Sequence, residues 1–164
     1  MIFADNILGF YILNMDKQLS REVAMTLRPK GYRPRLIDST LARRLRGFGA
    51  VKVAGPKFCG KTWTSMAQAE SIIHLDDDAL KQMVELDAAL ALEGETPHVI
   101  DEWQDVPKVW DATRRRVDKT GNIRGQFILT GSSTVDKTLV SHSGAGRIAT
   151  LAMRPMSLFE SGES

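Results

Sequence analysis

Residues 55–62 of this chain, Gly-Pro-Lys-Phe-Cys-Gly-Lys-Thr, match the pattern G-x-x-x-x-G-K-[ST], in which a glycine-rich loop wraps around phosphate groups. The glycines allow the backbone to approach an anion closely, and successive N–H groups point at it. The apolar run 50–54 precedes the loop as a predicted strand, and residues 64–70 follow it as a predicted helix. These flanks predict a triphosphate site, and the alternative is a glycine-rich turn on an unrelated fold.

The lysine and the threonine of this motif have separate chemical roles. Lys61 supplies a positive charge for the β- and γ-phosphates, and the Thr62 hydroxyl is placed to ligate Mg²⁺. The helix predicted to begin at Gly60 or Lys61 directs its partly positive N-terminus at the same anion. The predicted nucleotide-binding residues are Gly55, Pro56, Lys57, Phe58, Cys59, Gly60, Lys61, Thr62 and Trp63.

The composition is that of one soluble globular domain, with 164 residues of which 26% are charged and 43% are hydrophobic. The net charge of +2 is too small to indicate a nucleic-acid partner by itself. Cys59 is the single cysteine, which excludes an internal disulfide and fits a reducing cytoplasm. We interpret it as a small residue at a variable loop position, with an oxidation that blocks nucleotide as the alternative. No run is long and apolar enough to span a bilayer.

A change in composition divides the chain near Tyr32. Segment 28–35 carries two prolines, a glycine and four basic residues, which is typical of an irregular connector. Residues 1–31 are therefore expected to form an N-terminal extension and connector, and residues 32–164 the compact core. The apolar run 2–13 lacks the basic flank of a signal peptide. It is either an element packed on the core or sequence upstream of the true start.

Predicted strands and helices alternate along the core. The strands are expected at 50–54, 71–75, 98–100, 126–130 and 147–153, and further helices at 36–46, 76–94 and 107–119. The helix over 76–94 rests on the spacing of Leu80, Met83, Val84 and Leu90. Such alternation forms a parallel sheet with crossover helices on both faces. We expect an α/β fold of the P-loop NTPase type, a three-layer α/β/α sandwich with a mainly parallel five-stranded sheet.

The strand predicted at 98–100 runs directly into two acids. Asp101, at its tip, would hold Mg²⁺ through water, and Glu102 would polarise the attacking water as general base. Sites in open parallel sheets lie at the carboxyl ends of the strands, where this pair falls. The alternative is that both acids cap a buried strand with solvated charge.

Three further residues are candidates to complete the site. Thr130 and Ser132 end the strand predicted at 126–130 and could orient the lytic water, with Ser133 close behind. The alternative is a strand-to-helix turn rich in capping residues. Arg147 follows a glycine pair and could reach the γ-phosphate of its own or a neighbour's nucleotide as an arginine finger. Otherwise it is a surface arginine that opens the last strand.

A basic group surrounds the first helix of the core, and Asp38 is the only acid within it. The group could contact nucleic acid or nucleotide phosphates, although a solvated helix face is favoured. Its members are Lys30, Arg33, Arg35, Arg43, Arg44 and Arg46. The run 114–116 turns around its helix and carries less weight. The tryptophans at 63, 103 and 110 are expected in the core or an interface, and His98 and His142 show no metal-ligand spacing.

Six segments together resemble the AAA-type ATPase domain of prokaryotic proteins that usually continue into a restriction-nuclease-like C-terminal domain. They are 32–38 (YRPRLID), 55–62, 100–104 (IDEWQ), 127–132 (FILTGS), 144–147 (GAGR) and 153–160 (MRPMSLFE). The resemblance implies an additional-strand core, in which the Thr130 strand separates the Asp101 strand from the phosphate-loop strand. It also implies ATP rather than GTP, since no N-K-x-D-like guanine-reading motif is present.

The resemblance assigns roles to the same residues. Lys61 and Thr62 bind phosphate and Mg²⁺, Asp101 and Glu102 form the metal-and-base pair, Ser132 or Thr130 is the polar sensor, and Arg147 is the finger. The C-terminal lid or second domain of the family is expected to be absent from this chain. The expected function is an ATP-binding domain that hydrolyses ATP with Mg²⁺. The alternative is a nucleotide-dependent switch, or a nucleic-acid- or protein-binding module with little turnover. A homo-oligomer and nucleic acid stay open as partners, and no membrane is expected.

Overall fold

The computed structural model describes residues 27–132 and 144–163, and five strands in it form one sheet. The strands are β1 (Ala50–Gly55), β2 (Ser71–His74), β3 (His98–Asp101), β4 (Phe127–Ser132) and β5 (Ile148–Ala152). Their order is β2-β3-β4-β1-β5, and every neighbouring pair is parallel. Since β4 lies between β1 and β3, the predicted additional-strand order is confirmed.

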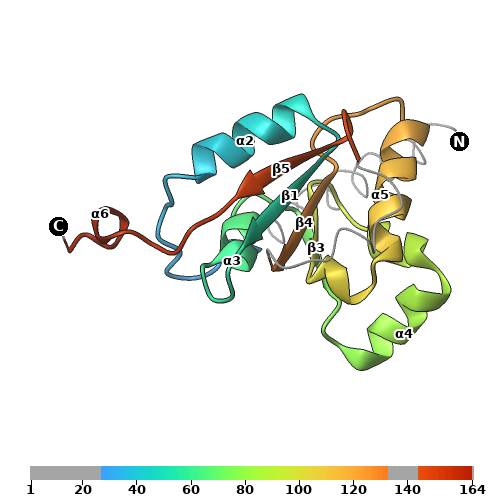
Figure 1. The fold of residues 1–164 in the computed structure, drawn as a ribbon, viewed down its shortest axis with the longest axis horizontal. Helices are drawn as coiled ribbons and strands as arrows, with labels where there is room; N and C mark the ends of the chain where they lie inside the picture. Colours follow the sequence, from blue (N-terminus) through green and yellow to red (C-terminus); the bar gives the residue numbers. More distant parts are fainter. Residues whose placement is uncertain (1–26, 133–143, 164) are drawn as a thin grey trace, which may run out of the picture.

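Helices cover both faces of the sheet and make three layers (Figure 1). The helices α2 (Asp38–Gly47) and α3 (Lys61–Met66) pack on one face. The other face carries α4 (Asp78–Leu86), the 3-10 helix η1 (Ala88–Leu92) and α5 (Lys108–Lys119). A second 3-10 turn, η2 (Trp103–Asp105), follows β3, and the short α6 (Leu158–Ser161) follows β5. This arrangement is the predicted α/β P-loop NTPase fold.

Side-chain alternation along the strands divides the core in two. Val51 and Val53 pack with Leu41 of α2, whereas Phe127 and Leu129 pack in the cluster under α5. Both halves exclude water almost completely, since these five side chains are at most 2% exposed. Burial of apolar surface on both sides of the strands stabilises a parallel sheet.

Two of the three tryptophans are core residues, as expected. Trp103 and Trp110 are 1% and 5% exposed, and their ring centroids are 5.1 Å apart. Trp63 differs, because it lies on α3 with 51% of its surface exposed. The expectation of a core position is therefore wrong for Trp63, although an interface position stays a prediction.

The single helix predicted over 76–94 is two elements in the structure. Asp77 caps α4 through Leu80 N–H, so the helix begins at Asp78, and it ends at Leu86. Asp87 then caps η1, since its carboxylate accepts the Ala89 N–H at 2.9 Å. Aspartate competes for backbone N–H groups in this way and interrupts helices. As a result the predicted apolar face is not continuous, and Met83 and Leu90 are 55% and 41% exposed.

Other boundaries shift by a few residues. β4 continues to Ser132 because Gly131 and Ser132 still pair with Ala54 and Gly55 of β1. Helix α3 ends at Met66, before the predicted end at 70. Residues 1–26, which hold the apolar run 2–13, and residues Ser133 and His142 lie outside the described part of the chain, so the predicted boundary near Tyr32 stays a prediction. Within residues 27–132 and 144–163, no helix combines the length and apolarity needed to cross a membrane.

Candidate functional site

The phosphate-loop motif joins the end of β1 to the start of α3. At Gly55, a Cβ atom would lie 2.5 Å from the Met153 carbonyl oxygen and 2.9 Å from Cys59 Sγ, so a side chain does not fit. Gly60 has a φ of +95°, in the left-handed region, immediately before the helix begins at Lys61. Both glycines of the motif are thus required by the backbone, as the phosphate-loop prediction supposes.

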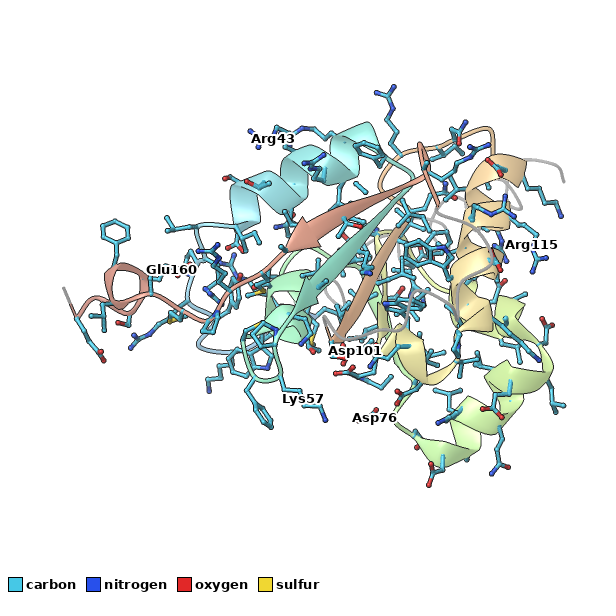
Figure 2. The ribbon with its side chains drawn as sticks, in the orientation of Figure 1. Arg43, Lys57, Asp76, Asp101, Arg115 and Glu160 are labelled. Carbon is cyan, nitrogen blue, oxygen red and sulfur yellow. The ribbon has the colours of Figure 1, made fainter. Side chains whose placement is uncertain are left out.

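The two lysines of the loop lie in different environments. The Lys61 side chain is 6% exposed, and its Nζ donates a hydrogen bond to the Pro56 carbonyl at 3.0 Å. Lys57 is exposed at the rim of the loop, near the carboxyl edge of the sheet (Figure 2). Phe58 is fully exposed with a φ of +62°. Lys61 is therefore the cation that the fold holds inside the loop.

Cys59 faces the interior and not the phosphates. Its side chain is 4% exposed and belongs to the core cluster under α2. A buried, apolar setting explains a small residue here. Its burial also argues against ready oxidation, because reactive thiols need access to solvent.

The Asp101 carboxylate collects hydrogen bonds from three elements. Thr62 Oγ1 at the start of α3 donates to Oδ1 at 3.0 Å, and Thr130 Oγ1 on β4 donates to the same oxygen. His74, the last residue of β2 and the register partner of Asp101, has Nδ1 3.1 Å from Oδ2. The carboxyl ends of β2, β3 and β4 meet at this edge, where Asp101 is labelled in Figure 2.

The side chains of Thr62 and Asp101 meet at the carboxyl edge of the sheet, where Mg²⁺ is expected. A hydroxyl and a carboxylate 3.0 Å apart are hard oxygen donors of the kind that Mg²⁺ prefers alongside nucleotide phosphates. Within the described ranges, no group of three or more His, Cys, Asp or Glu side chains could hold a metal without such help. The residues present therefore fit a phosphate-bound Mg²⁺ and not a metal held by protein side chains alone.

Glu102, the predicted general base, has an unusual backbone. Its φ and ψ are 52° and 44°, in the left-handed region, which is uncommon for a residue other than glycine and is found preferentially at functional sites. The side chain is half-buried, and its Oε2 accepts a hydrogen bond from Gln104 Nε2. The conformation turns the chain sharply after Asp101, so that the two acids differ in surroundings.

Sequence reasoning did not assign a role to Gln104 or His74. Gln104 contacts Glu102 directly, and Gly131 leaves room for it because a Cβ there would overlap Gln104 Oε1. His74 ends a strand next to β3, and parallel strand ends share one edge of a sheet. The position of His74 at a strand end was therefore a signal in the sequence that it could lie at the site. No motif or residue spacing indicated Gln104.

The two sensor candidates have different surroundings. Thr130 is fully buried and donates to Asp101, so its sensor role stays a prediction that its surroundings do not favour. Thr130 instead holds the carboxylate in place. Ser132 is half-buried and pairs in register with Gly55, the first residue of the loop. Ser132 stays the predicted sensor.

Arg147 lies at the other end of the sheet from the phosphate loop. It precedes β5, whose first residue Ile148 pairs with Ala50 at the start of β1, while the loop begins at Gly55. Five strand residues separate these ends by about 16 Å. Arg147 Nε is paired with Asp118 at 2.7 Å. The prediction that Arg147 contacts the nucleotide of its own chain is therefore wrong. Contact with a neighbour's nucleotide stays a prediction.

The basic group around α2 divides into exposed and buried members. Arg43, Arg44 and Arg46 are exposed on the helix, as the solvated-face interpretation expects. Arg35 is only 8% exposed and contacts the phosphate loop, so its place in a surface group is wrong. The reason is an acid from far along the chain, Glu160, which pairs with it at 3.0 Å.

The arginine run on α5 lies on a different surface. Arg114 and Arg116 pair with Asp118 at 3.4 Å and Glu93 at 2.6 Å. Arg115 lines a groove of about 490 Å³ between η1 and α5 that shares no residue with the phosphate loop. This groove is separate from the site at the carboxyl edge.

Comparison with known protein families agrees with the phosphate-loop motif. The profile of a protein family described as an AAA domain matches residues 48–161, which is more than half of the chain. No curated protein matches the chain in sequence.

Among solved structures, two variants of RuvB from Thermotoga maritima are similar at 22% and 23% identity, with TM-scores of 0.44 and 0.45. Each comparison covers 76% of this chain and 48% of RuvB. PCH-2 from C. elegans is similar at 16% identity and a TM-score of 0.35, over 90% of this chain and 45% of PCH-2. The chain spans about half the length of these proteins.

Proposed function

Because the chain belongs to the AAA domain family, we propose that it binds ATP and hydrolyses the β–γ phosphoanhydride bond with Mg²⁺. The observation that carries this proposal is the 3.0 Å contact between Thr62 and Asp101. It joins the phosphate loop to the acidic strand, so the phosphate-binding and metal-binding groups occupy one edge of the sheet. Glu102, the proposed general base, is the residue directly after Asp101.

Each residue of the site has a defined task in this reaction. The loop N–H groups and the Lys61 ammonium bind the phosphates and stabilise the charge of the transition state. Glu102 takes a proton from the water that attacks the γ-phosphorus in line, while the bond to the bridging oxygen breaks and ADP leaves. The Ser132 hydroxyl orients that water. Thr62 and Asp101 would hold Mg²⁺, which would supply neutralisation of the phosphate charge.

Three finer assignments belong to the same proposal. ATP is favoured over GTP because the chain has no guanine-reading motif. A homo-oligomer is included, since Arg147 is exposed at the end of the sheet opposite its own loop and could serve only a neighbour's nucleotide. The cytoplasm is the proposed location, in keeping with a single cysteine that is buried and free.

The second candidate is a nucleotide-dependent binding module with little turnover. The exposed Arg43, Arg44 and Arg46 favour an anionic partner such as nucleic acid for this module. Such binding would weaken as salt rises and would fall when Arg43 and Arg44 are replaced by alanine. Affinity that changes with neither salt nor these substitutions would assign the basic face to solvent.

The variant Glu102→Gln separates the two candidates. An ATPase should lose phosphate release by about a hundredfold or more, while ATP affinity stays within about threefold, because the amide cannot accept the proton. A binding module would show equal, negligible release in both proteins with ATP bound. If neither protein binds Mg²⁺-ATP, both candidate functions are wrong.

A further inference from the structure

Arg35 is a buried cation that joins three segments far apart in the sequence. Its Nη1 donates to the Cys59 carbonyl in the phosphate loop at 2.9 Å, and its Nη2 donates to the Arg154 carbonyl after β5 at 3.0 Å. Its Nε donates to Glu160 Oε1 in α6 at 3.0 Å. A planar guanidinium directs its donors from three nitrogens in fixed directions, whereas the three donors of an ammonium rotate about a single nitrogen.

The contact with Cys59 sets the orientation of a peptide unit in the loop. In a trans peptide the C=O and the following N–H point in opposite directions. Arg35 holds the Cys59 carbonyl from the buried side of the loop, so the Gly60 N–H points away from the interior. A Cβ on Gly60 would lie 3.2 Å from Arg35 Nη1, which places the guanidinium directly against this peptide. The side that Gly60 N–H faces is the side on which a phosphate-loop amide must point to bind an anion.

Glu160 in turn is held firmly in the segment after β5. Its Oε2 accepts from the Ser157 backbone N–H at 2.8 Å and its Oε1 from Leu36 N–H at 2.9 Å, and its side chain is 8% exposed. Ser157 and Glu160 form a capping box at the start of α6. These bonds, the Ser157 N–H foremost and then Leu36 N–H, lower the pKa of Glu160 to about 2, so it is ionised at neutral pH.

We infer that Arg35 is a positioning residue for the phosphate loop, and that Glu160 fixes Arg35, so the segment 154–161 controls the orientation of the Cys59–Gly60 peptide. The inference rests on the proposed function only in calling that peptide part of a nucleotide site. Figure 2 shows Glu160 where this segment leaves the sheet. Release of Glu160 would free Arg35, and the loop amide would then lose its fixed direction.

Arg35→Lys tests the inference without leaving Glu160 unpaired, since lysine keeps the positive charge but not the three directed bonds. Amide hydrogen exchange of residues 57–62 is measured without nucleotide, together with Mg²⁺-ATP affinity and the melting temperature. Arg33→Met is the matched control, because Arg33 Nη1 also binds the tail, at the Ser161 carbonyl (2.9 Å), whereas its hydrogen bonds within the described residues do not reach the loop 55–62. Glu160→Gln tests the second half of the inference.

We expect faster loop exchange and about tenfold weaker ATP binding in Arg35→Lys, which corresponds to the loss of one oriented hydrogen bond. Glu160→Gln should change both quantities in the same direction, and Arg33→Met should leave both within about twofold of the wild type. Loop exchange equal to the wild type in folded Arg35→Lys or Glu160→Gln would overturn the inference. A wild type that binds no ATP would refute the proposed function, yet loop exchange would still decide the role of Arg35.

Discussion

The Thr62 hydroxyl donates a hydrogen bond to the Asp101 carboxylate at 3.0 Å, although the two residues are 39 positions apart in the sequence. The contact reaches across the end of β4, which lies between β1 and β3, and Thr130 on that strand donates to the same carboxylate oxygen. The phosphate loop and the carboxyl ends of β3 and β4 thus lie at the same edge of the sheet.

Thr62→Ala should abolish most of the gain in ATP affinity that Mg²⁺ gives the wild type. The hydroxyl is the ligand that the loop itself contributes, and a methyl group cannot replace an oxygen donor. ATP titrations with Mg²⁺ and with EDTA measure this gain. Thr62→Ser, which keeps the hydroxyl, should behave as the wild type. An equal Mg²⁺ effect in Thr62→Ala would place the ion elsewhere.

Thr130→Val and Ser132→Ala should have different consequences. Thr130 is fully buried and bonded to a carboxylate, so its nearly isosteric replacement should destabilise the fold by about 1.5–3 kcal/mol in denaturant titrations. Ser132→Ala should slow phosphate release by about tenfold or more and leave stability within about 0.5 kcal/mol. The reverse pattern would exchange the roles assigned to the two residues.

Much of this site was predictable from the sequence because its chemistry follows directly from short patterns. The motif 55–62 and the acids after an apolar strand need only local spacing, and both lie as expected. Arg35 and Gln104 were not predictable in the same way. Arg35 pairs with Glu160, which lies 125 positions further along the chain, and Gln104 fits only because Gly131 has no side chain. Both arrangements depend on tertiary packing.

The errors of the sequence analysis have the same physical origin. Periodicity predicted one helix over 76–94, but the Asp87 carboxylate caps η1 and interrupts the helix despite the apolar repeat. The possible contact of Arg147 with its own chain's nucleotide relied on its glycine-rich flank, which says nothing about the end of the sheet from which β5 starts. Local pattern predicts element type and chemistry, whereas strand direction and order decide which groups meet.

Gly131→Ala should destabilise the protein by about 1–3 kcal/mol, because the new methyl group would overlap Gln104 and press on Trp103 Nε1 at 3.0 Å. Displacement of Gln104 from Glu102 should also lower phosphate release. Gly47→Ala is the matched control, because a Cβ there meets no atom within 4 Å. Thermal unfolding and release assays on both variants check this. Equal stability of the two would contradict the packing described around Gly131.

Stability at low pH should report the bonds of Glu160. Its pKa falls from 4.5 to about 2 in the fold, so its ionised form stabilises the protein fully above about pH 5. That contribution is lost progressively as the pH falls from 4.5 through 2. Glu160→Gln lacks this titration, so the gap in free energy of unfolding between wild type and variant should be largest at pH 7 and close near pH 2. A constant gap across this range would contradict the Glu160 contacts.

The most direct test of the ATPase proposal is the binding of a fluorescent ATP analogue with Mg²⁺, with phosphate release followed in the same samples, for wild type, Lys61→Ala and Lys57→Ala. The buried Lys61 should be required, with affinity at least about tenfold weaker in its absence, while loss of the exposed Lys57 side chain should change affinity by less than about threefold. The wild type and Lys57→Ala should release phosphate. Equal binding by all three proteins, or binding by none, would contradict the account of the loop as an ATP site.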